Sequence, residues 1–315
     1  MKISLVFPGQ GSQFIEMGKD FYSSFAIAKD VFSKLDNVLG RSLSEVIFSG
    51  SKTELSNTVN SQPSIMATSI AIYNVIIKEG YIADKDLISC VAGHSLGEYS
   101  ALVANESLSI EDSIKLLDIR ARAMQESMPI GTGGMAALIG KSLTEVEEIL
   151  PEIQKHGKIF IANDNADGQV VLSGEINPID FICENYKEFE IKRAIKLPVS
   201  APFHCELIES ASIKLKDEIA NQEFNNFIFP LYSNVTAEPC NNGTIKDLLV
   251  RQITNRVRWR ESIENMIRDD VGCFIEIGPG NVLTNLIKRI NKEVKAISIG
   301  SLEDLEKIKL IDFNL

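Results

Sequence analysis

The pentapeptide Gly93-His94-Ser95-Leu96-Gly97 has the G-x-S-x-G spacing of a nucleophile elbow. It follows the apolar run 87–92 and precedes an amphipathic stretch, so that a strand, a sharp turn and a helix are expected in the order that the motif requires. Glycines let the backbone fold back tightly and leave the serine hydroxyl exposed. The pattern predicts that Ser95 is a nucleophile for acyl chemistry, although a five-residue match also occurs by chance.

A serine nucleophile needs a base within hydrogen-bond reach, and histidine is the usual one. The chain has three histidines. His94 is next to Ser95 at a turn where neighbouring side chains point apart, and His156 lies at an expected helix C-terminus, where a capping role is expected. His204 lies in the proline-bounded loop 198–205, and loops at domain junctions are where ligand clefts form. By elimination His204 is the expected base, and an ordinary loop histidine is the alternative.

The segment Phe7-Pro8-Gly9-Gln10-Gly11-Ser12-Gln13 supplies two glycines after a strand-like run. Its Gly-x-Gly matches the first half of a dinucleotide fingerprint, but Phe14 stands where that motif needs a small residue. The alternative is a loop whose backbone N–H groups face the serine. The amides of Gln10 and Leu96 would then stabilise a tetrahedral oxyanion, with each donor worth about 3–4 kcal/mol in comparable enzymes.

Arg120 and Arg122 lie on an expected long helix, 102–124. Residues two apart do not share a helix face, so the two arginines point to different sides. An arginine that faces a cleft would bind a carboxylate through two hydrogen bonds. A solvated surface charge is the ordinary expectation for either of them.

Length and composition describe an ordinary folded protein. The 315 residues suffice for one large domain that carries a smaller one, and 44% of them are hydrophobic and 24% charged. The net charge of −11 gives no support for nucleic-acid binding, which needs a basic face. Five scattered cysteines predict free thiols in a reducing cytoplasm and no metal site. The longest uncharged stretch, 55–77, is too polar for a membrane span and predicts a buried helix behind Pro63.

Short apolar runs alternate with longer amphipathic stretches, which predicts an α/β fold with a mostly parallel sheet. The expected strands are 3–7, 87–92, 273–277 and 294–299, and the expected helices include 102–124 and 281–290.

The middle of the chain has another order of elements. Strand, helix, strand, strand, helix and strand are expected between residues 135 and 197, which is the βαββαβ signature of a ferredoxin-like unit. Turn signals at Gly133-Gly134 and Pro198 bracket this unit. We therefore expect a discontinuous large domain, 1–127 and 199–315, interrupted by a small subdomain, 128–198.

Taken together, the motifs resemble those of the malonyl-CoA:acyl-carrier-protein transacylase family, in the same order and over almost the whole chain. The matching blocks are Phe7–Gln13, Gln62-Pro63, Gly93–Tyr99, Arg120, Met124-Gln125, Gly168–Val171, Ser200–His204, Ser233–Val235 and Glu276–Gly280.

The resemblance implies an α/β-hydrolase-like core with an inserted ferredoxin-like subdomain. It implies that Ser95 accepts the acyl group, that His204 is its base and that Arg120 binds the malonyl carboxylate. The amides of Gln10 and Leu96 are implied as the oxyanion hole.

Further residues match the family less specifically. Gln62 and Gln169 resemble polar lining of the site. The family orients its histidine with a backbone carbonyl, for which Gln252 matches the segment and Asn234 is a second neighbour. Phe203 resembles the residue of malonyl-selective members, where the ring leaves little room for an α-methyl group.

The implied reaction is a ping-pong transfer of malonyl from malonyl-CoA to the phosphopantetheine thiol of acyl carrier protein, for fatty acid synthesis. It implies a cytoplasmic enzyme without a cofactor or metal of its own, and a monomer is the default expectation. A serine thioesterase or hydrolase, a trans-acting acyltransferase of a polyketide assembly line and a non-catalytic carrier-binding paralogue remain as alternatives. Two basic clusters are candidates for docking an acidic carrier: Arg251, Arg256, Arg258 and Arg260, and Lys288, Arg289 and Lys292.

Overall fold

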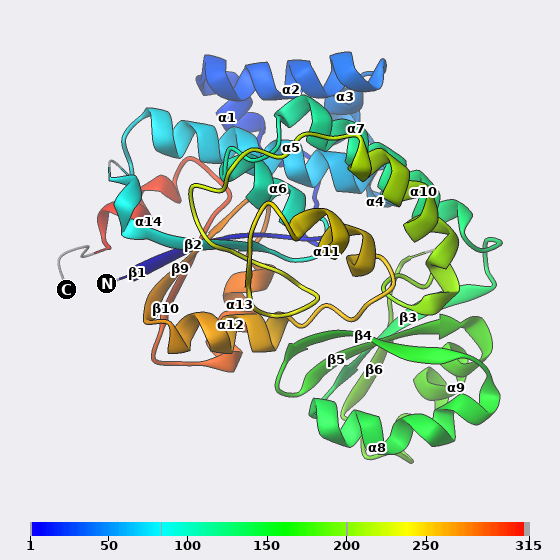
Figure 1. Cartoon of the computed structure of the whole chain (residues 1–315). Helices are drawn as coiled ribbons and strands as arrows, with labels where there is room; N and C mark the ends of the chain where they lie inside the picture. The colour runs from blue at the N-terminus through cyan, green and yellow to red at the C-terminus, as the bar shows by residue number, and fades with distance from the viewer. Residues whose placement is uncertain (1, 83, 200, 312–315) are drawn as a thin grey trace.

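Two β-sheets organise the chain in the computed structural model, which describes residues 2–82, 84–199 and 201–311 (Figure 1). The described strands of the larger sheet have the order β10-β9-β1-β2-β7-β8. Their bounds are β1 Lys2–Phe7, β2 Ile88–Gly93, β7 Leu231–Tyr232, β8 Pro239–Cys240, β9 Val271–Ile277 and β10 Lys295–Ile299.

The larger sheet is parallel apart from the short β7–β8 pair, as the alternating pattern predicts. The register pairs Phe7 with Gly93, and on the other side of β1 it pairs Val6 with Glu276. The carboxyl ends of these strands therefore meet at one edge, where open α/β sheets bind ligands. The glycine loop after β1 and the elbow after β2 lie side by side for this reason.

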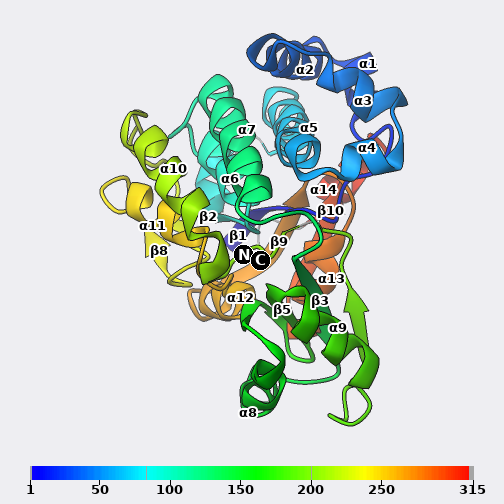
Figure 2. The ribbon, with the colours of Figure 1, turned by 90° about the vertical axis from the view of Figure 1, so that its right-hand side faces the viewer.

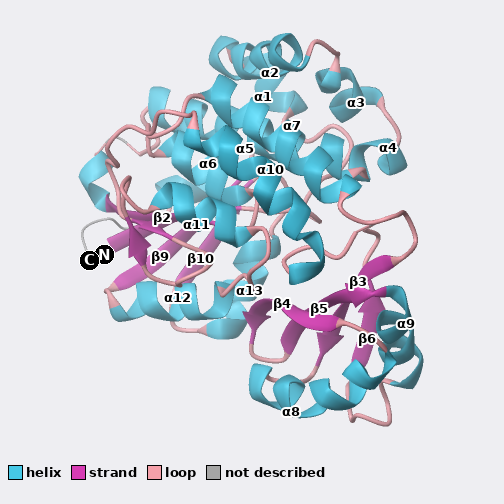
Figure 3. Cartoon of the chain, turned by 45° about the vertical axis from the view of Figure 1, so that its right-hand side comes forward, coloured by secondary structure: helices cyan, strands magenta, loops and turns pink. Residues whose placement is uncertain are grey.

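Helices cover both faces of the larger sheet (Figure 3). Successive residues of β1 point to opposite faces, so that Leu5 and Phe7 pack among α2, α5, α6 and α7, while Val6 packs against α12 and α13. Within the described residues, no helix is long and apolar enough to cross a membrane. The described α-helices outside residues 128–198 are α1 Lys19–Ser24, α2 Ala26–Leu39, α3 Leu43–Ser49, α4 Lys52–Ser56, α5 Thr58–Lys78, α6 Gly97–Ala104, α7 Ile110–Glu126, α10 Glu209–Ala220, α11 Ile245–Gln252, α12 Trp259–Arg268, α13 Val282–Ile290 and α14 Leu305–Lys309.

The prediction of one helix over 102–124 is wrong, because the chain forms α6 and α7 with a break between them. Asn105 ends α6, and its side-chain oxygen accepts two backbone N–H groups of the segment 228–229 at 2.8 and 2.7 Å. Ser109 then caps α7. Asn and Ser bond to nearby backbone in this way and so compete with continued helix.

The helix expected behind Pro63 begins ahead of it, at Thr58. Asn57 caps this helix, its side chain accepting the Val59 N–H at 3.1 Å. Proline has no N–H to donate to the carbonyl one turn before it. That carbonyl belongs to Val59 and accepts from Arg41 Nη2 at 3.4 Å. A tertiary hydrogen bond thus makes an interior proline tolerable.

The smaller sheet is antiparallel, has the strand order β4-β5-β3-β6 and stands apart from the larger one (Figure 2). Its elements follow the expected βαββαβ order, and their apolar side chains form a separate core. Their bounds are β3 Gly133–Ile139, α8 Leu143–Ile153, β4 Ile159–Ala166, β5 Gln169–Glu175, α9 Ile176–Asn185 and β6 Arg193–Lys196.

Candidate active site

The turn between β2 and α6 requires glycine on both sides of Ser95. A Cβ on Gly93 would lie 1.9 Å from the carbonyl carbon of Gly97, and a Cβ on Gly97 would lie 2.2 Å from the carbonyl oxygen of Phe7. Ser95 itself has φ 53°, in the left-handed region that costs a non-glycine residue energy. The strained elbow expected from the pentapeptide is therefore present.

Substituting alanine for Gly93 is expected to destabilise the fold by about 3 kcal/mol, because backbone rather than a flexible side chain must move. Urea unfolding of the variant would measure the loss. Gly243→Ala is the matched control, since its Cβ would meet only the Asn241 side chain, at 3.1 Å. Equal stability of the two variants would contradict the close approach at the elbow.

Ser95 and His204, the nucleophile and base expected from the sequence, lie within hydrogen-bond reach, with 2.8 Å between Ser95 Oγ and His204 Nε2. His204 Nδ1 lies 2.8 Å from the backbone oxygen of Gln252. A carbonyl can only accept, so Nδ1 carries the proton and Nε2 is left to accept from the serine hydroxyl. No aspartate is needed to select this tautomer. Asn234, the other candidate, holds the Ser95 amide instead, at 2.7 Å.

Burial, and secondarily the nearby Arg120 charge, lower the pKa of His204 to about 3. A base with a lowered pKa stays neutral as the pH falls, so acidification does not remove it. We expect kcat/KM for malonyl-CoA to stay flat from pH 7 to pH 5, measured as CoA release. A fall centred near the ordinary histidine pKa of about 6.5 would contradict this environment for His204.

Arg120 on α7 is the arginine that faces the site, and it is 1% exposed. Its Nη1 donates to Gln62 Oε1 at 2.5 Å, and its Nη2 donates to Ser95 Oγ at 3.0 Å. Its Nη2 also donates to Gln252 Oε1 at 2.9 Å. Within the described chain Arg120 has no ion pair with a carboxylate, and its Nε has no acceptor. Arg122 points outward and pairs with Asp118, as the two-residue spacing predicts.

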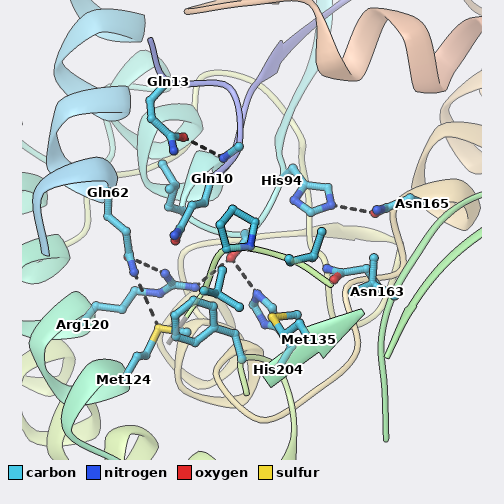
Figure 4. A pocket seen from close by; sticks show the side chains of 18 residues that line it. Gln10, Gln13, Gln62, His94, Arg120, Met124, Met135, Asn163, Asn165 and His204 are labelled. Atoms are coloured by element: carbon cyan, nitrogen blue, oxygen red, sulfur yellow. Dashed lines mark hydrogen bonds between the residues drawn. The ribbon is translucent and has the colours of Figure 1, made fainter. Parts of the chain in front are cut away.

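A cavity of about 180 Å³ opens over Ser95 and is bordered by strands of the smaller sheet on one side and by loops and helices packed on the larger sheet on the other. Arg120 and His204 approach the serine hydroxyl from different elements (Figure 4). Gln10 and Leu96 border the same cavity, and neither backbone N–H has an acceptor within the described part of the chain. Phe203 forms part of the wall. Two free amides, the expected nucleophile, the expected base and a buried cation therefore share one small space.

The expectation that Gln169 lines the site is wrong. Gln169 starts β5 and accepts from Arg289 Nη1 at 2.7 Å, outside the cavity. Val171 of the same motif shares that face of β5 and borders the cavity, whereas Gln169 lies at the start of the strand, beyond the cavity. Ser200, part of the matched block Ser200–His204, lies outside the described residues.

Two residues of the elbow motif have contacts that the sequence reasoning did not predict. His94 borders the cavity, where its Nε2 lies 2.8 Å from Asn165 Oδ1 on β4. Glu98 is fully buried beneath the elbow, and its carboxylate accepts from the backbone N–H of Asn234 at 2.5 Å. A carboxylate in the first turn of the otherwise apolar segment 97–104 was the available signal for Glu98, because a charge there cannot reach water.

A serine hydroxyl between a histidine and a buried arginine is typical of enzymes that act on acyl groups. In agreement, a family model described as the acyl transferase domain matches residues 4–308. The malonyl CoA-acyl carrier protein transacylase of Bacillus subtilis (strain 168) is 40% identical over 307 residues, covering 97% of this chain and 95% of the relative.

Solved structures agree with the relative. An acyl-carrier-protein S-malonyltransferase from Bartonella henselae superposes with a TM-score of 0.94 at 43% identity, covering 98% of each chain. A malonyl-transacylase solved in complex with a type II PKS acyl-carrier protein gives a TM-score of 0.93 at 36% identity, covering 98% of this chain and 99% of the other. The chain belongs to the malonyl CoA-acyl carrier protein transacylase family.

Proposed function

We propose that this protein transfers a malonyl group from malonyl-CoA to the phosphopantetheine thiol of an acyl carrier protein, as an extender unit for fatty acid synthesis. One observation carries the proposal: Arg120 is buried without a carboxylate partner in the described chain, 3.0 Å from the nucleophilic Ser95 oxygen. A buried guanidinium without a counter-ion is unfavourable unless the substrate supplies one. Malonyl-CoA brings a carboxylate to this place, and acetyl-CoA does not.

In the first half-reaction Ser95 Oγ bonds to the thioester carbon while its proton passes to His204 Nε2. The carbonyl becomes an oxyanion, which the Gln10 and Leu96 amides stabilise. The carbon–sulfur bond then breaks, and CoA leaves as the thiol with the proton from His204. The malonyl group remains on Ser95 as an ester. Arg120 holds its free carboxylate, with Gln62 fixing the guanidinium from behind.

In the second half-reaction the carrier thiol gives its proton to His204, and its sulfur attacks the malonyl ester. Collapse of the second oxyanion returns the proton to Ser95 and releases malonyl-carrier protein. These steps need no cofactor of the enzyme's own, because the phosphopantetheine belongs to the partner. Phe203 on the cavity wall favours malonyl over a substrate with an α-methyl group.

The finer features of the architecture belong to the same proposal. We assign 1–127 and 199–315 to an α/β-hydrolase-like catalytic domain and 128–198 to a ferredoxin-like subdomain. The antiparallel order β4-β5-β3-β6 supports the second assignment. A monomer in the cytoplasm fits five cysteines without disulfides.

Of the two basic clusters, the one at 288–292 is the better docking surface for an acidic carrier. Each arginine of the other cluster has a carboxylate partner: Arg251 with Asp247, Arg256 with Glu147, Arg258 with Glu261, and Arg260 with Asp164. In the 288–292 cluster, Arg289 bonds only to neutral Gln169, and neither lysine has an ion pair within the described residues. Unpaired charges attract a partner without first losing a bond.

Replacing Lys288 and Lys292 together by glutamate is expected to raise KM for the carrier about tenfold. The rate of CoA release from malonyl-CoA alone should not change, since neither residue borders the cavity. Arg251→Glu, in the paired cluster, is the matched control. An unchanged carrier KM in the double variant would exclude this surface.

A serine hydrolase would use the same Ser95 and His204 and let water deacylate the enzyme. The products separate the two activities. With malonyl-CoA and holo-carrier protein, transfer yields malonyl-carrier thioester, and hydrolysis yields free malonate with no gain of thioester. Free malonate as the main product would reject transfer.

A further inference from the structure

Glu98 is a buried carboxylate for which the proposed reaction has no role. It lies in the first turn of α6 and has no exposed surface. One carboxylate oxygen of Glu98 accepts from the backbone N–H of Asn234 at 2.5 Å, and the other accepts from the side-chain Nε2 of Gln252. Neither donor carries a charge, so the carboxylate has hydrogen bonds without direct neutralisation.

Gln252 connects this carboxylate to the substrate-binding arginine. Its Nε2 donates to Glu98, while its Oε1 accepts from Arg120 Nη2 at 2.9 Å. The same Nε2 also donates to the Ser95 carbonyl at 3.0 Å. The side-chain amide of Gln252 therefore bridges the Glu98 carboxylate and the Arg120 guanidinium beside Ser95, and these two contacts fix its orientation.

The buried charges do not balance once the substrate is present. When Glu98 is ionised, it offsets part of the Arg120 charge across the amide. A malonyl group adds a second carboxylate, and the described cavity residues offer no second cation for it, because His94 and His204 have pKa values lowered by burial. Two carboxylates that share one guanidinium in a buried site cannot both remain ionised without a large penalty.

We propose that Glu98 is a positioning residue that controls the affinity of Arg120 for an acyl carboxylate through its own protonation. Protonated, Glu98 leaves the guanidinium charge to the malonyl group. Ionised, it competes for that charge through Gln252, so malonyl binding to the ionised form takes up one proton from solvent onto the Glu98 carboxylate. This inference rests on the proposed function, in which Arg120 binds malonyl.

The neighbours of Glu98 leave it as the group that titrates near neutral pH. Burial raises its pKa to about 8, although its hydrogen bonds and Arg120 oppose the shift. Burial also raises the pKa of Tyr99 on the same helix, and raises that of Cys240 on β8 to about 12. On the other elements around α6, Arg120 of α7 lies across Gln252 from Glu98, and burial raises the pKa values of Cys90 and Tyr73. The remaining charged residues of α7, Lys2 on β1, Lys78 on α5 and the Asp247–Arg251 pair of α11 are partly or fully exposed to solvent.

The direction of the pH effect follows from the charges. Below pH 8 Glu98 is mostly protonated and malonyl affinity is at its maximum. As the pH rises through 8, the ionised form accumulates and malonyl affinity falls. Between pH 7.5 and 9 one group of this kind weakens binding about tenfold. Acetyl-CoA, which has no acyl carboxylate, should show no such loss.

The test measures the dissociation constants of malonyl-CoA and acetyl-CoA for the Ser95→Ala protein, which binds without being acylated, from pH 6.5 to 9.5. Effects of pH on the shared CoA portion cancel in the ratio of the two constants. We expect malonyl-CoA to bind much more tightly at pH 7, with a preference that falls about tenfold by pH 9. In the Ser95→Ala/Glu98→Gln protein the preference should not change with pH.

Glu276→Gln in the same background is the matched control, because Glu276 is a second fully buried carboxylate that bonds to the Leu283 and Thr284 amides instead. It should leave the pH dependence in place. A large preference that is flat with pH would overturn the role of Glu98 and leave the proposed function standing. Equal binding of both ligands at every pH would instead reject Arg120 as the malonyl site. The pH dependence of the malonyl-CoA preference in the Ser95→Ala protein alone distinguishes these outcomes, even if the Glu98→Gln variant does not fold.

Discussion

The Ser95→Ala enzyme is expected to transfer malonyl with kcat lowered by a factor of about 10⁴ or more. The loss is large because Ser95 forms the covalent bond in both half-reactions, and because its hydroxyl is the group that His204 and Arg120 both contact. Binding of malonyl-CoA should survive, since the cavity and the guanidinium are unchanged. Steady-state transfer to holo-carrier protein measures the effect.

Ser100→Ala is the matched control for this variant. Ser100 lies on the same helix, is fully buried and has no hydrogen-bond partner for its hydroxyl in the described structure. Its removal should leave transfer near the native rate. Substantial residual transfer by the Ser95 variant would assign the acyl group to another residue.

Replacing Arg120 by alanine is expected to reverse the preference for malonyl-CoA. Breaking a buried charge pair is worth about 2–5 kcal/mol, which corresponds to a loss of about 30-fold to several thousand-fold in kcat/KM for malonyl transfer. Acetyl-CoA suffers no such loss, because the desolvated guanidinium that disfavours it is gone. Competition between the two thioesters for one carrier measures the change.

The control for Arg120 is Arg122, which lies two residues away in sequence and points to another side of α7. Arg122→Ala removes an exposed arginine paired with Asp118 and should affect neither substrate. The Arg120 variant also leaves Gln62 Oε1 without its donor, so thermal unfolding should accompany the kinetics. Undiminished malonyl transfer in a folded Arg120→Ala enzyme would contradict the proposal that Arg120 binds the malonyl carboxylate.

The sequence predicted the parts of this site that depend on local geometry. The elbow needs glycine at fixed spacing around Ser95, and the apolar runs 3–7 and 87–92 were expected as strands of a mostly parallel sheet. Choosing His204 needed only a count of three histidines and the position of one loop. Such inferences depend on neighbours in the chain, which a single sequence contains.

The features that the sequence left open or did not predict are contacts between distant segments. Whether Gln252 or Asn234 orients His204 depends on which carbonyl reaches the ring, and no local pattern encodes that. Gln169 belongs to a matched motif, but Val171, two residues further along the same strand, borders the cavity in its place. The charge of Glu98 was visible in the sequence, but its partners, Asn234 and Gln252, lie more than 130 residues further along the chain.

The central claim is that a malonyl group passes through an ester on Ser95. Intact-mass measurement of the protein mixed with malonyl-CoA tests it most directly. We expect an added mass of one malonyl group, absent in the Ser95→Ala protein and lost from the native protein as holo-carrier protein gains it. An adduct that persists in the Ser95→Ala protein, or one that leaves as free malonate without reaching the carrier, would contradict the account.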